Sequence, residues 1–256
     1  MTAAATQNGT VRLAAVGDIH CSRTSQGQLR DLFAWAAEHA DVLLLCGDLT
    51  DYGIPEEAKI LVEELAVAAH LPRIAVLGNH DFECSKHAEL EHVLVDSGVI
   101  VLDGESCEVE GIGFAGVKGF AGGFGERMLQ PWGEDAVKHF VRESVDEAVK
   151  LEAALTRLKT PQRIVLMHYS PIRATVEGES PEIFPFLGSS RLEQALNPHR
   201  VTAVFHGHAH KGRPEGRTSA GVPVYNVAVP VLLAAAPGRP PIRILELPRG
   251  AQRDVA

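Results

Sequence analysis

The sequence lacks a long apolar run, a basic leader and an excess of positive charge. No apolar run approaches the ~18 consecutive residues that a membrane-spanning helix needs. Residues 1–10 are small and polar, without the basic start and apolar stretch of a secretory signal. The net charge of −9 disfavours non-specific binding to nucleic acid, which depends on clustered lysine and arginine. We therefore expect neither a membrane nor a non-specific nucleic-acid partner.

Cysteine is also scarce. The four residues of this type, Cys21, Cys46, Cys84 and Cys107, show no CxxC spacing. A chain of 256 residues, 45% of them hydrophobic, buries a core large enough to fold without disulfides. These features predict reduced thiols in a cytoplasmic protein, and no zinc-finger site.

No linker rich in proline, glycine or serine divides the chain. The candidate site residues described below run from position 18 to position 210, so any division would separate them. We predict a single domain over residues 1–249, followed by a loose C-terminal tail at 250–256.

The apolar pattern of the first third predicts a βαβαβ arrangement. Its strands are continuously apolar rather than alternating, as expected for strands that are covered on both faces. Short β-rich pieces between 99 and 117 indicate hairpins. The expected strands are 11–16, 42–46, 73–77, 162–167 and 201–205, with β-rich segments at 222–233 and 242–247, and the expected helices are 27–39, 55–69, 134–158 and 190–196.

Five apolar runs end abruptly in clusters of aspartate, asparagine and histidine. Side chains that follow the strands of an open α/β sheet gather at one edge of that sheet. Carboxylate oxygen with imidazole nitrogen is a ligand set that suits Zn, Mn, Fe or Co. The clusters contain Asp18 and His20, Asp48 and Asp51, Asn79 to Asp81, His168, and His206, His208 and His210.

Taken singly, each cluster has an ordinary explanation as a turn or a structural histidine. Jointly they hold six of the twelve histidines, which favours a chemical site. Within them we expect Asp51 to cap its turn, His206 to support the ligands, and His80 beside Asp81 to act as a proton donor fixed in one tautomer. The remaining histidines are interpreted as surface or packing residues: His39, His70, His87, His92, His139 and His199.

In their order, Asp-x-His, Gly-Asp-x-x-Asp, Gly-Asn-His-Asp, a lone His and Gly-His-x-His resemble the signature of the calcineurin-like metallophosphoesterases. The first three motifs start at positions 17, 47 and 78. The resemblance implies a four-layer α/β/β/α sandwich of two mixed β-sheets flanked by helices. It also implies two divalent or mixed-valence metal ions, most often Mn, Fe or Zn. One would be held by Asp18, His20, Asp48 and His210, and the other by Asp48, Asn79, His168 and His208.

The resemblance further implies hydrolysis of a small phosphate ester by in-line attack of a metal-bridging hydroxide. His80 would protonate the leaving oxygen, and Asp81 would orient His80. The compact layout is closest to small bacterial cyclic-nucleotide phosphodiesterases, so phosphodiesters such as cyclic nucleotides are favoured. The alternatives are a phosphomonoesterase, a protein phosphatase, a hydrolase of another bond, or a non-catalytic scaffold that binds proteins, which the complete ligand set disfavours.

Two local features bear on specificity. The glycine-rich loop 118–133 combines aromatic and cationic residues, and it is either a substrate flap or a plain flexible connection. Arg23 and Arg173 each follow a motif closely and are candidates for phosphate contact, although surface arginines are usually only solvated.

Overall fold

The computed structural model describes residues 9–249, and the expected loose tail at 250–256 lies outside them. Its strands form two sheets. The first has the order β11-β1-β2-β3-β4, with parallel pairing except for β11, which runs antiparallel to β1. Its strands are β1 (Thr10–Val16), β2 (Val42–Cys46), β3 (Arg73–Val76), β4 (Val99–Val101) and β11 (Arg243–Pro248).

The second sheet has the order β5-β6-β7-β8-β10-β9. Its inner strands β6, β7, β8 and β10 are parallel, and the edge strands β5 and β9 are antiparallel to their neighbours. The strands are β5 (Ser106–Val109), β6 (Ile112–Gly116), β7 (Arg163–Leu166), β8 (Ala203–His206), β9 (Glu215–Arg217) and β10 (Pro223–Asn226).

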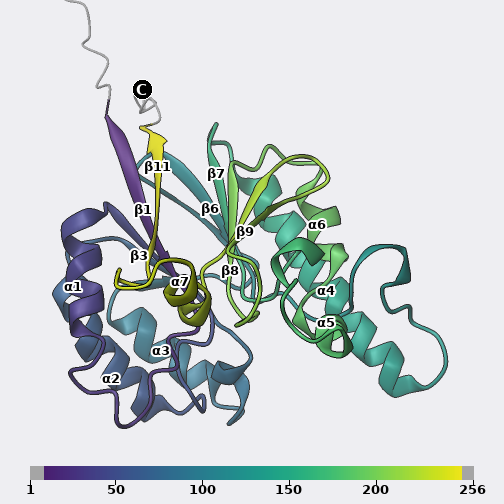
Figure 1. Ribbon diagram of the computed structural model, residues 1–256, viewed down its shortest axis with the longest axis horizontal. Coiled ribbons are helices and arrows are strands. Elements are labelled where there is room, and N and C mark those ends of the chain that lie inside the picture. The colour runs from purple at the N-terminus through teal and green to yellow at the C-terminus, as the bar shows by residue number, and fades with distance from the viewer. Residues whose placement is uncertain (1–8, 250–256) are drawn as a thin grey trace, which may run out of the picture.

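Helices flank the two sheets (Figure 1). The first group, α1 to α3, lies on one side of the molecule, and α4 to α6 lie on the other. The α-helices are α1 (Arg30–His39), α2 (Pro55–Leu65), α3 (His87–Asp96), α4 (Asp135–Arg157), α5 (Phe184–Leu187), α6 (Ser190–Leu196) and α7 (Val229–Ala235). Short 3₁₀ turns are η1 (Ala66–Ala68), η2 (His80–Phe82), η3 (Gly125–Arg127), η4 (Arg173–Thr175) and η5 (Pro181–Ile183).

Alternation along the strands divides the apolar core into layers. In β1, Ala14 and Val16 pack with Phe33 of α1, whereas Leu13 and Ala15 face the second sheet. A third apolar cluster joins the outer face of the second sheet to α4 and α6. Helix, sheet, sheet and helix therefore form four layers, which confirms the predicted α/β/β/α sandwich of two mixed β-sheets.

Several segments differ from the expectation, and the short helix α5 and the strand β9 had no expected counterpart. Residues 99–101 form β4 of the first sheet, so only β5 and β6 make a hairpin within the expected hairpin region. The segment 222–233 is a strand followed by α7, which begins with a proline in its first turn. Helix α3 was not expected, because it buries only Leu90 and Leu94 and so carries a weak apolar pattern. Short apolar runs fit strand and helix equally well, which explains the error at α7.

All four cysteines lie in the described part of the chain and are free thiols. Between residues 9 and 249, no helix combines the length and the apolar character needed to cross a membrane.

Candidate metal centre

The five expected clusters converge on one edge of the molecule, beyond the carboxyl ends of β1, β2, β3, β7 and β8. Backbone pairing carries the loops together past the strand ends. The amide of Asp18 donates to the Gly47 carbonyl at 3.0 Å, and that of His20 donates to the Asp48 carbonyl at 3.0 Å. The loops after β1 and β2 therefore hold their side chains in a fixed relation to each other.

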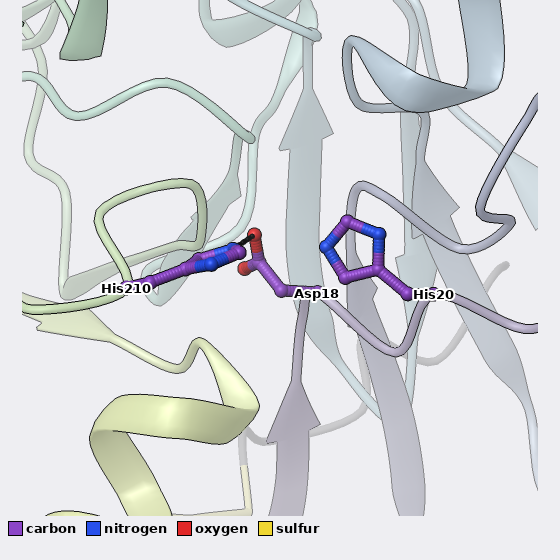
Figure 2. A group of neighbouring side chains, drawn as sticks. All are labelled: Asp18, His20 and His210. Carbon is purple, nitrogen blue, oxygen red and sulfur yellow. Dashed lines mark hydrogen bonds and ion pairs between the residues drawn. The ribbon is translucent and has the colours of Figure 1, made fainter.

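The first group consists of Asp18, His20 and His210, whose potential ligand atoms lie within 4.8 Å of one another. Asp18 stands at the tip of β1 with an imidazole on either side (Figure 2). His210 Nε2 lies 2.8 Å from Asp18 Oδ1. Asp48 adjoins this group, because its Oδ2 lies 3.9 Å from His20 Nε2.

The second group consists of Asp48, His168 and His208, also within 4.8 Å of one another. His168 Nε2 lies 3.3 Å from Asp48 Oδ1 and 2.9 Å from Asn79 Oδ1. Asp48 thus adjoins both groups. The structure brings together all seven residues that the sequence pattern singled out as ligands: Asp18, His20, Asp48, Asn79, His168, His208 and His210.

Glycines inside the motifs make this crowding possible. A Cβ atom on Gly78 would lie 2.2 Å from the backbone nitrogen of Asp48, and one on Gly207 would lie 2.1 Å from Asp18 Oδ2. A Cβ on Gly47, whose φ is +80°, would enter the His168 ring at 2.4 Å. The missing side chain of each glycine therefore leaves room for one candidate ligand, Asp48, Asp18 or His168, to lie against the glycine's loop.

Four candidate ligands adopt the left-handed backbone region, which residues with a Cβ rarely occupy: Asp18 (φ 56°), His20 (φ 48°), Asp48 (φ 47°) and His208 (φ 68°). Such conformations cost about 1–3 kcal/mol each and cluster at functional sites. The fold stabilises them here through the backbone pairing and the glycine contacts described above.

Buried charge is concentrated at Asp48 and His168. Burial disfavours the charged form of each group, but the attraction between the two opposite charges outweighs this effect. This attraction lowers the pKa of Asp48 well below its usual range and raises the pKa of His168 to about 9. Burial lowers the pKa of His208 to about 4, so this ring is neutral and offers a lone pair.

The surroundings of His20 fit a bound metal ion. Both ring nitrogens of His20 are buried and lack a hydrogen bond within the described residues. Nδ1 faces Asp51 Oδ1 at 3.4 Å, which leaves Nε2 directed at the carboxylate groups. A carboxylate behind one nitrogen of a histidine commonly fixes the tautomer whose other nitrogen binds a metal.

The His80 ring has a different partner from the expected one. Its Nδ1 lies 2.7 Å from the carbonyl oxygen of Asp51, and its side chain is 36% exposed. The buried Asp81 carboxylate instead accepts hydrogen bonds from Thr50 Oγ1 (2.6 Å) and from the amides of Thr50 (2.9 Å) and Gly78 (2.8 Å). The expectation that Asp81 orients the His80 ring is therefore corrected: Asp81 ties the loop after β2 to the loop after β3.

Burial, reinforced by the charge of Asp48, raises the pKa of Asp81 to about 6. His206 is fully buried and bonds the Gly207 carbonyl and Thr175 Oγ1 through its two nitrogens, as a supporting residue would. Sequence reasoning missed Thr50, and also Phe186, whose carbonyl lies 3.1 Å from His208 Nε2. Phe186 lies in the short helix α5, 22 residues away in sequence, and no motif marks it.

The structure also places the two features expected to bear on specificity, the loop 118–133 and the arginines Arg23 and Arg173. The early part of loop 118–133 is bonded to another segment, since the amides of Gly122 and Gly123 donate to the carbonyls of Pro185 and Gly188. Arg173 lies over the Phe184 ring, with Cζ 5.5 Å from its centroid. Arg23 lines a pocket that also contains Asp51.

Two packed sheets with aspartates and histidines clustered at one edge define an α/β sandwich protein with a candidate metal centre. The family model for calcineurin-like phosphoesterases matches residues 11–212, so the chain belongs to this family. Members of this family are generally hydrolases of phosphoric esters and use dinuclear metal centres. No curated protein matches the sequence.

Solved structures share the fold at low sequence identity. A phosphopantetheinyl hydrolase from Mycobacterium tuberculosis superposes with a TM-score of 0.63 at 14% identity, over 91% of this chain and 95% of that chain. The purple acid phosphatase PPD1 from yellow lupin gives 0.54 at 14% identity, over 88% of this chain and 44% of that one. GAP50, the anchor in the inner membrane complex of Plasmodium, gives 0.55 at 12%, over 87% and 73%. These likenesses concern the fold alone.

Proposed function

We propose that the protein is a dinuclear metal-dependent phosphoesterase with an intact catalytic centre. The observation that carries the proposal is the pair of side-chain groups that both adjoin Asp48, together with the unbonded buried nitrogens of His20. Asp48 would bridge the two ions. The first ion would be held by Asp18, His20, Asp48 and His210, and the second by Asp48, Asn79, His168 and His208.

The two ions would supply water activation near neutral pH and would neutralise the charge of the phosphoryl group. Mn, Fe and Zn all suit this set of nitrogen and oxygen donors. The chain itself excludes bulk water from Asp48 and His168, which are buried, and keeps His208 neutral for binding. His80 stands at the exposed rim, where its ring can donate a proton to a leaving oxygen.

The carbonyl of Asp51 supports the role of His80 as a proton donor. A hydrogen bond from Nδ1–H to this carbonyl fixes the ring orientation and leaves Nε2 free to face a substrate. We expect His80→Gln to retain both metals while lowering turnover by about 10²–10⁴-fold, the usual contribution of acid–base catalysis. Metal analysis alongside kinetics tests this, and a variant that loses metal in proportion to activity would remove His80 from catalysis.

Phosphodiesters, including cyclic nucleotides, are the favoured substrates of this proposal. The support is the compact layout, which resembles small bacterial phosphodiesterases of the cyclic-nucleotide class. A phosphomonoesterase or protein phosphatase on the same centre is the alternative. The cytoplasmic location expected from the free thiols stays a prediction.

The decisive experiment strips the full chain of metal, reloads it with Mn, Fe or Zn, and measures metal content. Hydrolysis is then compared for a phosphomonoester, an aryl phosphodiester, and 2′,3′- and 3′,5′-cyclic nucleotides. We expect activity to require two ions per chain and to favour a diester. Inactivity on every substrate with both ions bound would contradict the proposal and indicate a scaffold instead.

A further inference from the structure

A pocket of about 490 Å³ opens beside the candidate centre. It is lined by residues 22–24 from the loop after β1 and by Asp51, Tyr52, Ile54 and Glu57 from the segment after β2. Its volume falls within the ~300–1,000 Å³ of sites that bind small molecules. The pocket adjoins the centre at Asp51, whose Oδ1 lies 3.4 Å from His20 Nδ1.

Backbone hydrogen bonds connect the pocket rigidly to the centre. The amide of Cys21 donates to the Leu49 carbonyl, and the amide of Asp51 donates to the Cys21 carbonyl, each at 3.0 Å. These bonds continue the pairing that positions His20 against Asp48. The pocket therefore keeps a fixed place relative to the candidate ligands, as a substrate subsite requires.

The proton donor determines which part of a substrate faces the pocket. In an in-line displacement, the group that protonates the leaving oxygen stands on the leaving-group side. His80 contacts the carbonyl of Asp51, and the Asp51 side chain lines the pocket. With His80 as the proposed proton donor, the leaving alcohol would thus face the pocket.

The two acidic residues of the pocket have polar partners, whereas its arginine has none within residues 9–249. The Asp51 carboxylate faces His20 Nδ1 at 3.4 Å, and buried Glu57 accepts the amide of Tyr52 at 2.8 Å. Within residues 9–249, the exposed side chain of Arg23 has neither a hydrogen bond nor an ion pair. Tyr52, which is 56% exposed, lines the same pocket. An unpaired guanidinium beside an exposed ring suits a planar group that carries a negative charge.

Resting on the proposed function, we propose that the pocket receives the leaving group of the ester, and that Arg23 and Tyr52 select leaving groups that carry their own anionic group. Arg23 would contact that anionic group, and the ring of Tyr52 would pack against the body of the leaving group. Nucleotides and carboxylated or phosphorylated alcohols belong to this class. Uncharged small alcohols do not.

The test uses the metal-loaded full chain and two matched substrate pairs. The monoesters are phenyl phosphate and 4-carboxyphenyl phosphate, and the diesters are methyl phenyl phosphate and methyl 4-carboxyphenyl phosphate. Each pair differs only by a carboxylate on the leaving group. Comparing every variant with the unmodified protein on the same ester cancels the intrinsic reactivity of the two phenols.

We expect Arg23→Gln to raise KM for the carboxylated esters by about five- to tenfold, as expected for a partly exposed charged hydrogen bond. The phenyl esters should change less than about twofold. Arg23→Lys should retain part of the preference, since it keeps the charge. Tyr52→Leu should raise KM for both members of each pair by about two- to fivefold, since it removes ring packing from either leaving group. The control is Arg30→Gln, an equal change of charge at an exposed residue of α1 outside the pocket.

Equal effects of Arg23→Gln on the carboxylated and the phenyl esters would overturn the proposal, as would equal effects of Arg23→Gln and Arg30→Gln. A binding measurement separates this proposal from the proposed function. Calorimetry with 4-phosphonobenzoate and phenylphosphonate, which resist hydrolysis, should show tighter binding of the carboxylated compound, lost in Arg23→Gln. If the protein hydrolysed none of the four esters, the proposed function would be overturned. If it bound the two phosphonates equally, the pocket assignment would be overturned.

Discussion

The two sheets hold their candidate ligands in different ways. In the first sheet, the loops after β1 and β2 are paired backbone to backbone, and the Asp81 carboxylate bonds the loop after β3 to the loop after β2. In the second sheet, distant segments hold the ligands. The Lys118 carbonyl accepts the amide of His168, and the Phe186 carbonyl faces His208 Nε2. The loops of the first sheet therefore form a frame among themselves, whereas the ligands of the second sheet also depend on residues far away in sequence, Lys118 and Phe186 of α5.

The strongest test of this comparison contrasts a residue shared by both groups with one from the second sheet alone. Asp48 adjoins both groups, whereas His208 belongs to one. We expect Asp48→Asn to lose both ions and His208→Ala to retain about one ion per chain, because each ligand of a dinuclear site affects the ion it contacts. Metal analysis after dialysis measures this.

Activity in Asp48→Asn should fall by at least about 10²-fold, since even residues that merely support metal ligands contribute 10- to 100-fold. Equal metal loss in the two variants would show that the second-sheet ligands are as central to the site as the shared carboxylate. Circular dichroism on both proteins controls for unfolding.

A second test compares two motif glycines. The Cβ of Gly78→Ala would meet a backbone nitrogen at 2.2 Å, whereas the nearest atom to the Cβ of Gly207→Ala belongs to the side chain of Asp18 rather than to the backbone. We expect losses of about 2–3 kcal/mol for Gly78→Ala and about 1–2 kcal/mol for Gly207→Ala in the free energy of unfolding. Urea denaturation measures both. Gly9→Ala, where the nearest atom is 3.7 Å away, is the control and should be nearly neutral.

The convergence of the seven candidate ligands was predictable because it follows from a rule about parallel strands. Residues after β1, β2, β3, β7 and β8 had to meet at one edge once the sandwich formed. The contacts of His80, Asp81 and His208 were not predictable, because they depend on the paths of loops. Adjacent positions in sequence suggested that Asp81 supports His80, yet the η2 turn directs Asp81 into the core and the ring toward Asp51.

The same distinction applies to the fold. Continuously apolar runs predicted β1, β2 and β3 of the first sheet and β7 and β8 of the second correctly. Helix α3 was missed because its apolar residues show only a weak helical periodicity, and α7 was missed because a short apolar run fits strand and helix equally well. These two helices are stabilised by packing against the completed sandwich, and the local sequence pattern does not encode that packing.

Asp81 gives a third test, aimed at the frame itself. Replacing its carboxylate by an amide in Asp81→Asn leaves the buried amides of Thr50 and Gly78 competing for one oxygen. We expect a loss of about 2 kcal/mol in unfolding free energy, from donors left without acceptors, together with reduced metal content. Thr50→Val, which removes one hydrogen bond to Asp81, should cost about 1 kcal/mol. An Asp81→Asn protein with unchanged stability and metal content but slower turnover would restore the original role of Asp81 behind His80.

The smallest effect is expected at Lys118, where the second-sheet region meets the first. Its Nζ lies 4.9 Å from the centroid of the Phe120 ring and 5.5 Å from those of Phe82 and Tyr169. Lys118→Met keeps the apolar stem and removes the charge, so we expect a loss of about 1 kcal/mol in stability and less than threefold in turnover. Lys138→Met, an exposed lysine of α4, should change stability by less than about 0.5 kcal/mol. A tenfold loss of turnover in Lys118→Met at unchanged stability would place the ammonium group in the reaction, and the loop that contains Lys118 would then contribute to catalysis as well as to the support of His168.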